Sequence, residues 1–328
     1  MPVEPQDPTP SDAQSINAQA SVLMKQGIRL MADPEPEAVG KAIRCFDDAL
    51  ELRLRLPVGT VPLFGYGLAA CWLNRADALV RLADPARMAD ALHSYDQGIA
   101  VLRKLPLCED PRFPRRLAVA HQNRALALQI QAQAGSPAAI AGFTEAIAVL
   151  DQDYSRSIAD RAYLQAVVWM NLANARLSET TAESWSCARD AAVSAMSLVA
   201  GSEEADADAA EVGLKARHVL CHTIAQRLSL IAAGEDTPAE EVHQATDIAD
   251  EGLALARRWE QKGVIRFRPL AYDLFRFGAR VYARYQPQFL DEFIADNLDP
   301  ARSSTEYVES PEMRSAAEEA RALVERGR

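Results

Sequence analysis

The stretch NRADAL, Asn74–Leu79, returns as NRALAL, Asn123–Leu128, a step of 49 residues from position 74 to position 123. The agreement continues on both sides in the same register, through proline, aromatic and small residues. The matching pairs include Pro57 and Pro106, Pro62 and Pro111, Phe64 and Phe113, Ala42 and Ala91, and Phe46 and Tyr95. Looser copies follow at Gly142–Leu150, Ala191–Val199, Asp247–Leu255 and Leu274–Tyr282. This many matches at one spacing predict an internal repeat.

Each unit of the repeat has the pattern of two helices. The first helix carries apolar and small residues at helical spacing, as in Trp72, Ala76 and Leu79. The second carries a small residue, an aromatic four positions later and a small residue three later, as in Ala139 and Phe143. Small residues allow helix axes to approach closely, and the aromatic fills the remaining space. Proline-rich connectors end one helix before the next begins. The pattern predicts an all-α chain of antiparallel helix pairs.

These residues resemble the tetratricopeptide repeat family. WMNLANARL, Trp169–Leu177, is similar to the first helix of that motif, and so is WLNRADAL, Trp72–Leu79. The resemblance covers roughly residues 15 to 285. It implies a right-handed superhelical solenoid of about five to six repeats, which binds proteins or peptides in its concave groove. The family unit has 34 residues, so the longer unit here requires longer helices and connectors.

The ends of the chain differ from the repeats. Residues 1–12 are rich in proline and acidic residues, and we expect a disordered tail with no signal peptide. The repeat domain is expected to cover 13–328. Its last helix, about 310–327, has Ser310 as N-cap and Pro311 in the first turn, and it should cover the end of the array.

The amino-acid composition reduces the classes of partner that we expect. The net charge of -11 argues against a general binder of nucleic acid or anionic membranes. No run of about twenty apolar residues occurs, so no membrane span is expected. The five cysteines form no CxxC pair, which is typical of a reduced, cytoplasmic protein. The oligomeric state is not indicated.

One position of the first helices is predicted to face the groove. An asparagine there could bind the backbone of an extended peptide through its donors and acceptor, or it could instead bond to a neighbouring helix and hold the curvature. Arginines at four-residue spacing form a basic stripe at the C-terminal end, either a solvated face or a site for acidic groups. The expected groove residues are Lys25, Asn74, Asn123, Asn171, Asn174, His222, Arg276, Arg280 and Arg284. The lysine and arginine positions of the family's carboxylate clamp are not filled, so a full clamp is not expected.

Enzyme signals are weak by comparison. RHVLCH, Arg217–His222, has the R-x4-H spacing of helical ribonucleases, and His218 and His222 have zinc-ligand spacing without a third ligand. EEVH, Glu240–His243, lacks the second copy that a di-iron site requires. His93 and His121 lie on apolar helices and are expected in the core. We therefore expect no cofactor and no metal.

The sequence thus predicts a non-catalytic scaffold that binds a protein or an extended peptide, including one with acidic groups. One alternative is a regulatory protein that senses a small ligand or a peptide. An alternative from another class is a ribonuclease that uses Arg217 and His222.

Overall fold

The structure is a computed structural model, and it describes residues 9–33, 35–132, 136–179, 181–229, 239–299 and 308–327. Within these ranges the chain is all-α, with thirteen α-helices, four short 3-10 helices and no strand. The chain divides into two compact units, residues 1–161 and 162–328. Among the described helices, none is both long and apolar enough to cross a bilayer.

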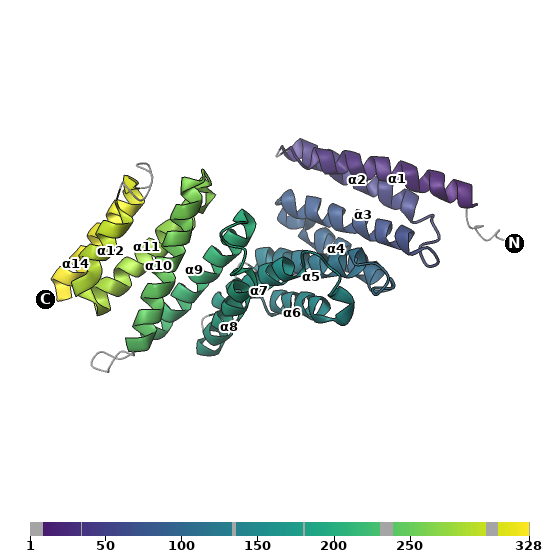
Figure 1. The fold of residues 1–328 in the computed structure, drawn as a ribbon. Helices are drawn as coiled ribbons and strands as arrows, with labels where there is room; N and C mark the ends of the chain where they lie inside the picture. Colours follow the sequence, from purple (N-terminus) through teal and green to yellow (C-terminus); the bar gives the residue numbers. More distant parts are fainter. Residues whose placement is uncertain are drawn as a thin grey trace. The chain divides into compact units, whose positions relative to one another are not determined.

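The first unit is a series of helices in which each packs on the next, as Figure 1 shows for α1 to α6. The first-type helices α1, α3 and α5 also contact one another, and these contacts lie one repeat apart. The helices are α1 (Pro10–Leu30), α2 (Pro36–Arg53), α3 (Pro62–Arg81), α4 (Met88–Leu102), α5 (Arg112–Ala132) and α6 (Pro137–Asp151).

The second unit continues the helical pattern. Helix α9 packs on α8 and α10, α10 packs on α11, and the two first-type helices α9 and α11 are in direct contact. The last helix, α14, packs on α11. The helices are α7 (Arg161–Leu177), α8 (Ala182–Val199), α9 (Ala207–Ser229), α10 (Ala239–Gln261), α11 (Arg268–Tyr285), α12 (Leu290–Asn297) and α14 (Pro311–Gly327).

Prolines and capping side chains determine where several of the helices begin. Five of the described α-helices begin at a proline, whose missing N–H costs nothing in the first turn. Helix α1 begins at Pro10, and the Thr9 side chain accepts from the Asp12 backbone N–H. Residues 10–12 of the expected tail therefore belong to this helix, because the cap and the proline start it early. Residues 1–8, the rest of that tail, lie outside the described residues. At the other end, Met313 N donates to Ser310 Oγ at 3.2 Å, which is the expected cap of α14.

The repeated small and aromatic residues form the core. Phe46 and Phe143 are fully buried, each between buried alanines of its own helix. The Phe46 ring occupies the space beside Gly27 of α1, where a Cβ would collide with it. Gly278 of α11 lies the same way against Phe293, 2.7 Å from where a Cβ would stand. Close approach of helices at small residues, with a ring filling the gap, is therefore what joins neighbouring helices.

The arginines of the repeated stretch also make a repeated interaction. Arg75 Nε donates to Asp47 Oδ1 at 2.6 Å, and Arg124 Nε donates to Asp96 Oδ1 at 2.7 Å. Both pairs join a first-type helix to the second-type helix before it, and both span 28 residues. The agreement of NRADAL with NRALAL thus includes a structural ion pair as well as the core positions.

Candidate functional site

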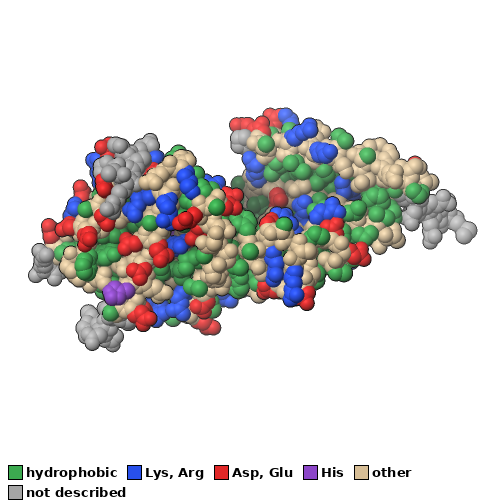
Figure 2. All heavy atoms as spheres, viewed as in Figure 1, with side chains coloured by type: hydrophobic (Ala, Val, Ile, Leu, Met, Phe, Trp, Pro, Cys, Tyr) green, Lys and Arg blue, Asp and Glu red, His purple; other side chains and the backbone are tan. Residues whose placement is uncertain are grey.

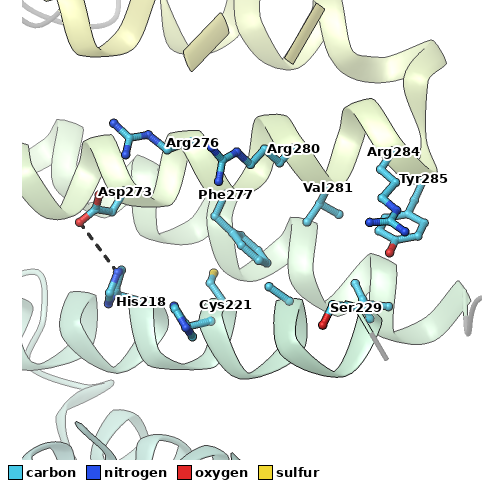
Figure 3. A pocket seen from close by; sticks show the side chains of 13 residues that line it. His218, Cys221, Ser229, Asp273, Arg276, Phe277, Arg280, Val281, Arg284 and Tyr285 are labelled. Carbon is cyan, nitrogen blue, oxygen red and sulfur yellow. Dashed lines mark ion pairs between the residues drawn. The ribbon is translucent and has the colours of Figure 1, made fainter. Parts of the chain in front are cut away.

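A cavity of about 310 Å³ opens between α9 and α11 in the second unit. Figure 3 shows Phe277 and Val281 of α11 pointing toward α9, where Cys221 lies opposite them. Ala225 of α9 also lines this floor. Val281 and Cys221 are buried, whereas Phe277 and Ala225 are half-buried and so present apolar surface to a ligand. The floor of the cavity is therefore apolar, between two helices that the fold holds in direct contact.

Three arginines form one rim of this cavity. Arg276, Arg280 and Arg284 are exposed and follow each other at one-turn intervals along α11, as Figure 3 shows. Arg280 Nη2 lies 3.3 Å from Glu319 Oε2 of α14, in a pair that is more than half exposed on both sides. In the described part of the chain, Arg276 and Arg284 have no carboxylate partner. The Arg284 guanidinium lies 5.5 Å from the centre of the Tyr285 ring. Two guanidinium groups are thus left for a ligand.

Two histidines of α9 form the opposite rim. His218 Nε2 lies 3.8 Å from Asp273 Oδ2, the interaction marked in Figure 3. His222 lies one turn further along α9, and its Nε2 is 3.3 Å from Gln226 Nε2. Burial lowers the pKa of His222 below its ordinary value, and the neighbouring His218 lowers it further. His222 is consequently neutral at pH 7 and adds positive charge to the rim only in acid.

The charge of the cavity is opposite to that of the protein. Three arginines and one aspartate line it, a net charge of +2 with the histidines neutral, whereas the whole chain carries -11. Elsewhere, on the face shown in Figure 2, basic and acidic side chains are interspersed among apolar ones. A local positive field on an acidic protein attracts anionic groups selectively, since the rest of the surface repels them.

The structure brings together four of the nine expected groove residues: His222, Arg276, Arg280 and Arg284. Asn171 and Asn174 belong to the same unit but do not line this cavity. Asn174 Nδ2 lies 3.0 Å from Met170 Sδ, a contact within its own helix. Asn171 is half-buried and has no side-chain hydrogen bond within the described ranges.

The other three expected residues belong to the first unit. Lys25 is exposed and Asn74 is half-buried, and neither side chain has a hydrogen-bond partner among the residues described. Asn123 differs, because its Nδ2 donates to Asp77 Oδ1 of α3 at 3.2 Å. The same oxygen accepts from Tyr95 of α4 at 2.5 Å. Of the two alternatives for the asparagine row, a bond to a neighbouring helix is the one observed at Asn123.

Asp77 is thus a polar junction of three helices. Burial raises its pKa, while the hydrogen bonds from Tyr95 and Asn123 act in the opposite direction by stabilising the carboxylate. The partner of Asn123 was not foreseen from the sequence. No local spacing pointed to it, since Asp77 and Asn123 lie 46 residues apart in the sequence.

RHVLCH is divided between the core and the surface. Arg217 is buried, and its Nη1 donates to Glu203 Oε1 at 2.7 Å, with Nη2 3.3 Å from Glu203 Oε2. His222 is exposed at the cavity, and Leu220 is buried in the helix interface. The arginine and the histidine of the R-x4-H spacing therefore do not face a common site. In the part of the chain described, no group of three or more His, Cys, Asp or Glu residues could hold a metal ion.

The two histidines that were expected in the core, His93 and His121, differ from each other. His121 is buried as expected, 3% exposed, with its Nδ1 2.8 Å from Glu145 Oε2. Burial lowers the pKa of His121 to about 4. The expectation for His93 is wrong, because His93 is exposed and packs edge-on against Trp72 with ring centres 6.2 Å apart.

Comparison with protein-family models gives no match, and comparison with curated proteins gives none either.

Proposed function

We propose that this chain is a non-catalytic binding scaffold that holds a protein or peptide partner along its first-type helices. The observation that carries the proposal is the cavity between α9 and α11, where four of the expected groove residues meet over an apolar floor. Apolar floors with a few convergent polar groups are the usual composition of ligand sites. The opposite arrangement, in which the arginines pair with acidic neighbours, would have left nothing for a partner.

The fold that we propose for the whole chain is a right-handed solenoid of five to six tetratricopeptide-like repeats. The sequential packing of helices and the 28-residue ion pairs support a repeated unit. In such arrays the first-type helices line the concave side, and contacts between α9 and α11 agree with that role. A partner in the groove would be cytoplasmic and would be neither nucleic acid nor a membrane.

The proposal is tested by capture on matched surfaces. Wild-type protein, a variant with Arg276→Glu and Arg284→Glu, and a control with Arg314→Glu are immobilised and exposed to lysate from cells that naturally express the chain. Arg314 is an exposed arginine of α14 outside the cavity, so its reversal changes net charge without changing the site. We expect a defined partner on wild type and control that is lost on the double variant. The same proteins on all three surfaces would contradict a groove-bound partner.

A small-molecule sensor is the second candidate, because a cavity of about 310 Å³ could also hold a small ligand. It would be favoured if extraction of the purified protein released a stoichiometric small anion, and if the Arg276→Glu, Arg284→Glu variant purified without it.

A further inference from the structure

We propose that the cavity between α9 and α11 binds an extended acidic segment, in which acidic side chains alternate with apolar ones. This inference rests on the proposed binding function and specifies the chemistry of the partner. The first observation is the positive charge of the arginines that line the cavity. Arg276 and Arg284 have no carboxylate partner in the described residues, and Arg280 has only the exposed pair with Glu319. Guanidinium groups bind carboxylates through paired, charge-assisted hydrogen bonds, so a row of them selects an acidic ligand.

The spacing of the arginines fits an extended chain. A rise of about 1.5 Å per residue separates successive arginines, four residues apart, by roughly 6 Å along α11. In an extended peptide, side chains on one side recur every second residue, at about 6.6 Å. Over the three arginines the difference is about 1 Å, which flexible arginine side chains can absorb. Five residues of such a peptide therefore present three carboxylates to the three arginines.

The apolar floor accounts for the alternating residues. In an extended chain successive side chains point to opposite sides. With the acidic side chains at the arginine rim, the intervening side chains are turned away from that rim and toward the space between α9 and α11. There Phe277 and Ala225 offer apolar surface. The volume of about 310 Å³ suits two aliphatic side chains rather than a whole helix.

The Asp273 carboxylate makes the two ends of the arginine row electrostatically different. Asp273 lies at the Arg276 end of the rim, beside His218 (Figure 3). Its carboxylate repels an acid there, and the Glu319 carboxylate partly neutralises Arg280, so the positive field is strongest at Arg284. An acidic segment should therefore be held more tightly by Arg284 than by Arg276.

The probe is a fluorescein-labelled peptide in which three glutamates alternate with leucines. Its comparators are the same peptide with glutamines for glutamates, and a longer one with glutamates at every fourth residue. Fluorescence anisotropy with the full-length protein measures the affinities. We expect the alternating acidic peptide to bind most tightly, and to bind more weakly as salt is raised. Arg284→Gln should reduce its affinity about tenfold or more, and Arg276→Gln somewhat less.

Two further variants separate binding from folding. Arg314→Gln removes an arginine outside the cavity and should leave the affinity unchanged. Ala225→Phe should fill the floor and reduce the affinity at least tenfold while keeping all three arginines. The melting temperature of each variant is measured, and affinities are compared only for variants whose melting temperature equals that of wild type.

Several outcomes would overturn the inference. These are equal affinity for the glutamine peptide, tighter binding of the peptide with fourth-residue spacing, or no effect of Arg276→Gln and Arg284→Gln. If any of these results is found while the Arg276→Glu, Arg284→Glu variant still loses its captured partner, the proposed binding function stands and the acidic ligand is wrong. If the acidic peptide binds as expected but no partner is captured through the groove, the site stands and the scaffold function is wrong.

Discussion

Replacing Asn123 with alanine should destabilise the protein, whereas the same change at Asn171 should not. Asn123 donates to Asp77 Oδ1 at 3.2 Å, so the variant removes a hydrogen bond to a half-buried carboxylate. Asn171 is half-buried and has no side-chain hydrogen bond in the described ranges. The two residues occupy equivalent positions of the repeat, so one is the natural control for the other.

The size of the effect follows from the geometry. A hydrogen bond to a charged group contributes about 1.5–3 kcal/mol. The distance of 3.2 Å is long, and Tyr95 retains its bond to the same oxygen at 2.5 Å. Asn123→Ala should therefore lower the free energy of unfolding by about 1.5 kcal/mol, the lower end of the range. Asn171→Ala should stay within about 0.5 kcal/mol of wild type, as ordinary surface changes do.

The assay is urea unfolding at pH 7 and at lower pH. Burial already raises the pKa of Asp77, and loss of the Asn123 donor raises it further. As pH falls through that raised pKa, Asp77 takes up a proton in the folded state and the penalty of the missing donor shrinks. The deficit of Asn123→Ala should therefore be largest at pH 7 and smaller in acid. Equal stability of the two alanine variants at pH 7 would refute the structural role of Asn123.

Four other changes give distinct outcomes. Gly213→Ala would place a Cβ against the Glu203 carboxylate and break its buried pair with arginine, at a cost of about 3–5 kcal/mol by urea unfolding; Gly40→Ala, with nothing within 4 Å, should instead stabilise by about 0.5–1 kcal/mol. His121 has a folded pKa of about 4 against an ordinary 6.5. The buried neutral side chain therefore makes its full contribution to the free energy of unfolding above pH 6.5, and this contribution is lost as pH falls toward 4. His121→Gln should remove up to ~3 kcal/mol of that acid sensitivity, and an unchanged pH profile would exclude His121 as its source. Deleting residues 309–328 exposes the face of α11 that α14 covers and should lower the melting temperature and cause aggregation; an unchanged melt would mean that this helix stabilises nothing.

The sequence was sufficient for the elements and for much of the core. Spacing of small and aromatic residues identified positions such as Phe46 and Phe143, which are fully buried. Proline and serine identified the start of α14, because caps depend on residues within one turn. The four-residue spacing of Arg276, Arg280 and Arg284 identified one side of the cavity, since a helix places such residues on one face.

The sequence pattern could not show which side chains pair with each other across neighbouring helices. Just before α11, Arg266 pairs with Asp208 and Glu211 of α9. Lys262 is likewise occupied, stacked 4.1 Å from the Trp259 ring centre. Their charges are used in packing, because the fold brings acids and rings from distant segments beside them.

The sequence by itself determined that this chain is helical, how its helices alternate, and much of the core, because these properties depend on residues a few positions apart. Only the tertiary structure decided which polar residues remain for a partner. Asn123 is bound to Asp77, and Arg217 is bound to Glu203. Arg276 and Arg284 border an apolar cavity and form no ion pair with a carboxylate in the described residues. Whether a charged side chain stabilises the fold or serves a ligand depends on which neighbours lie within about 4 Å, and that is set by the packing of helices far apart in sequence.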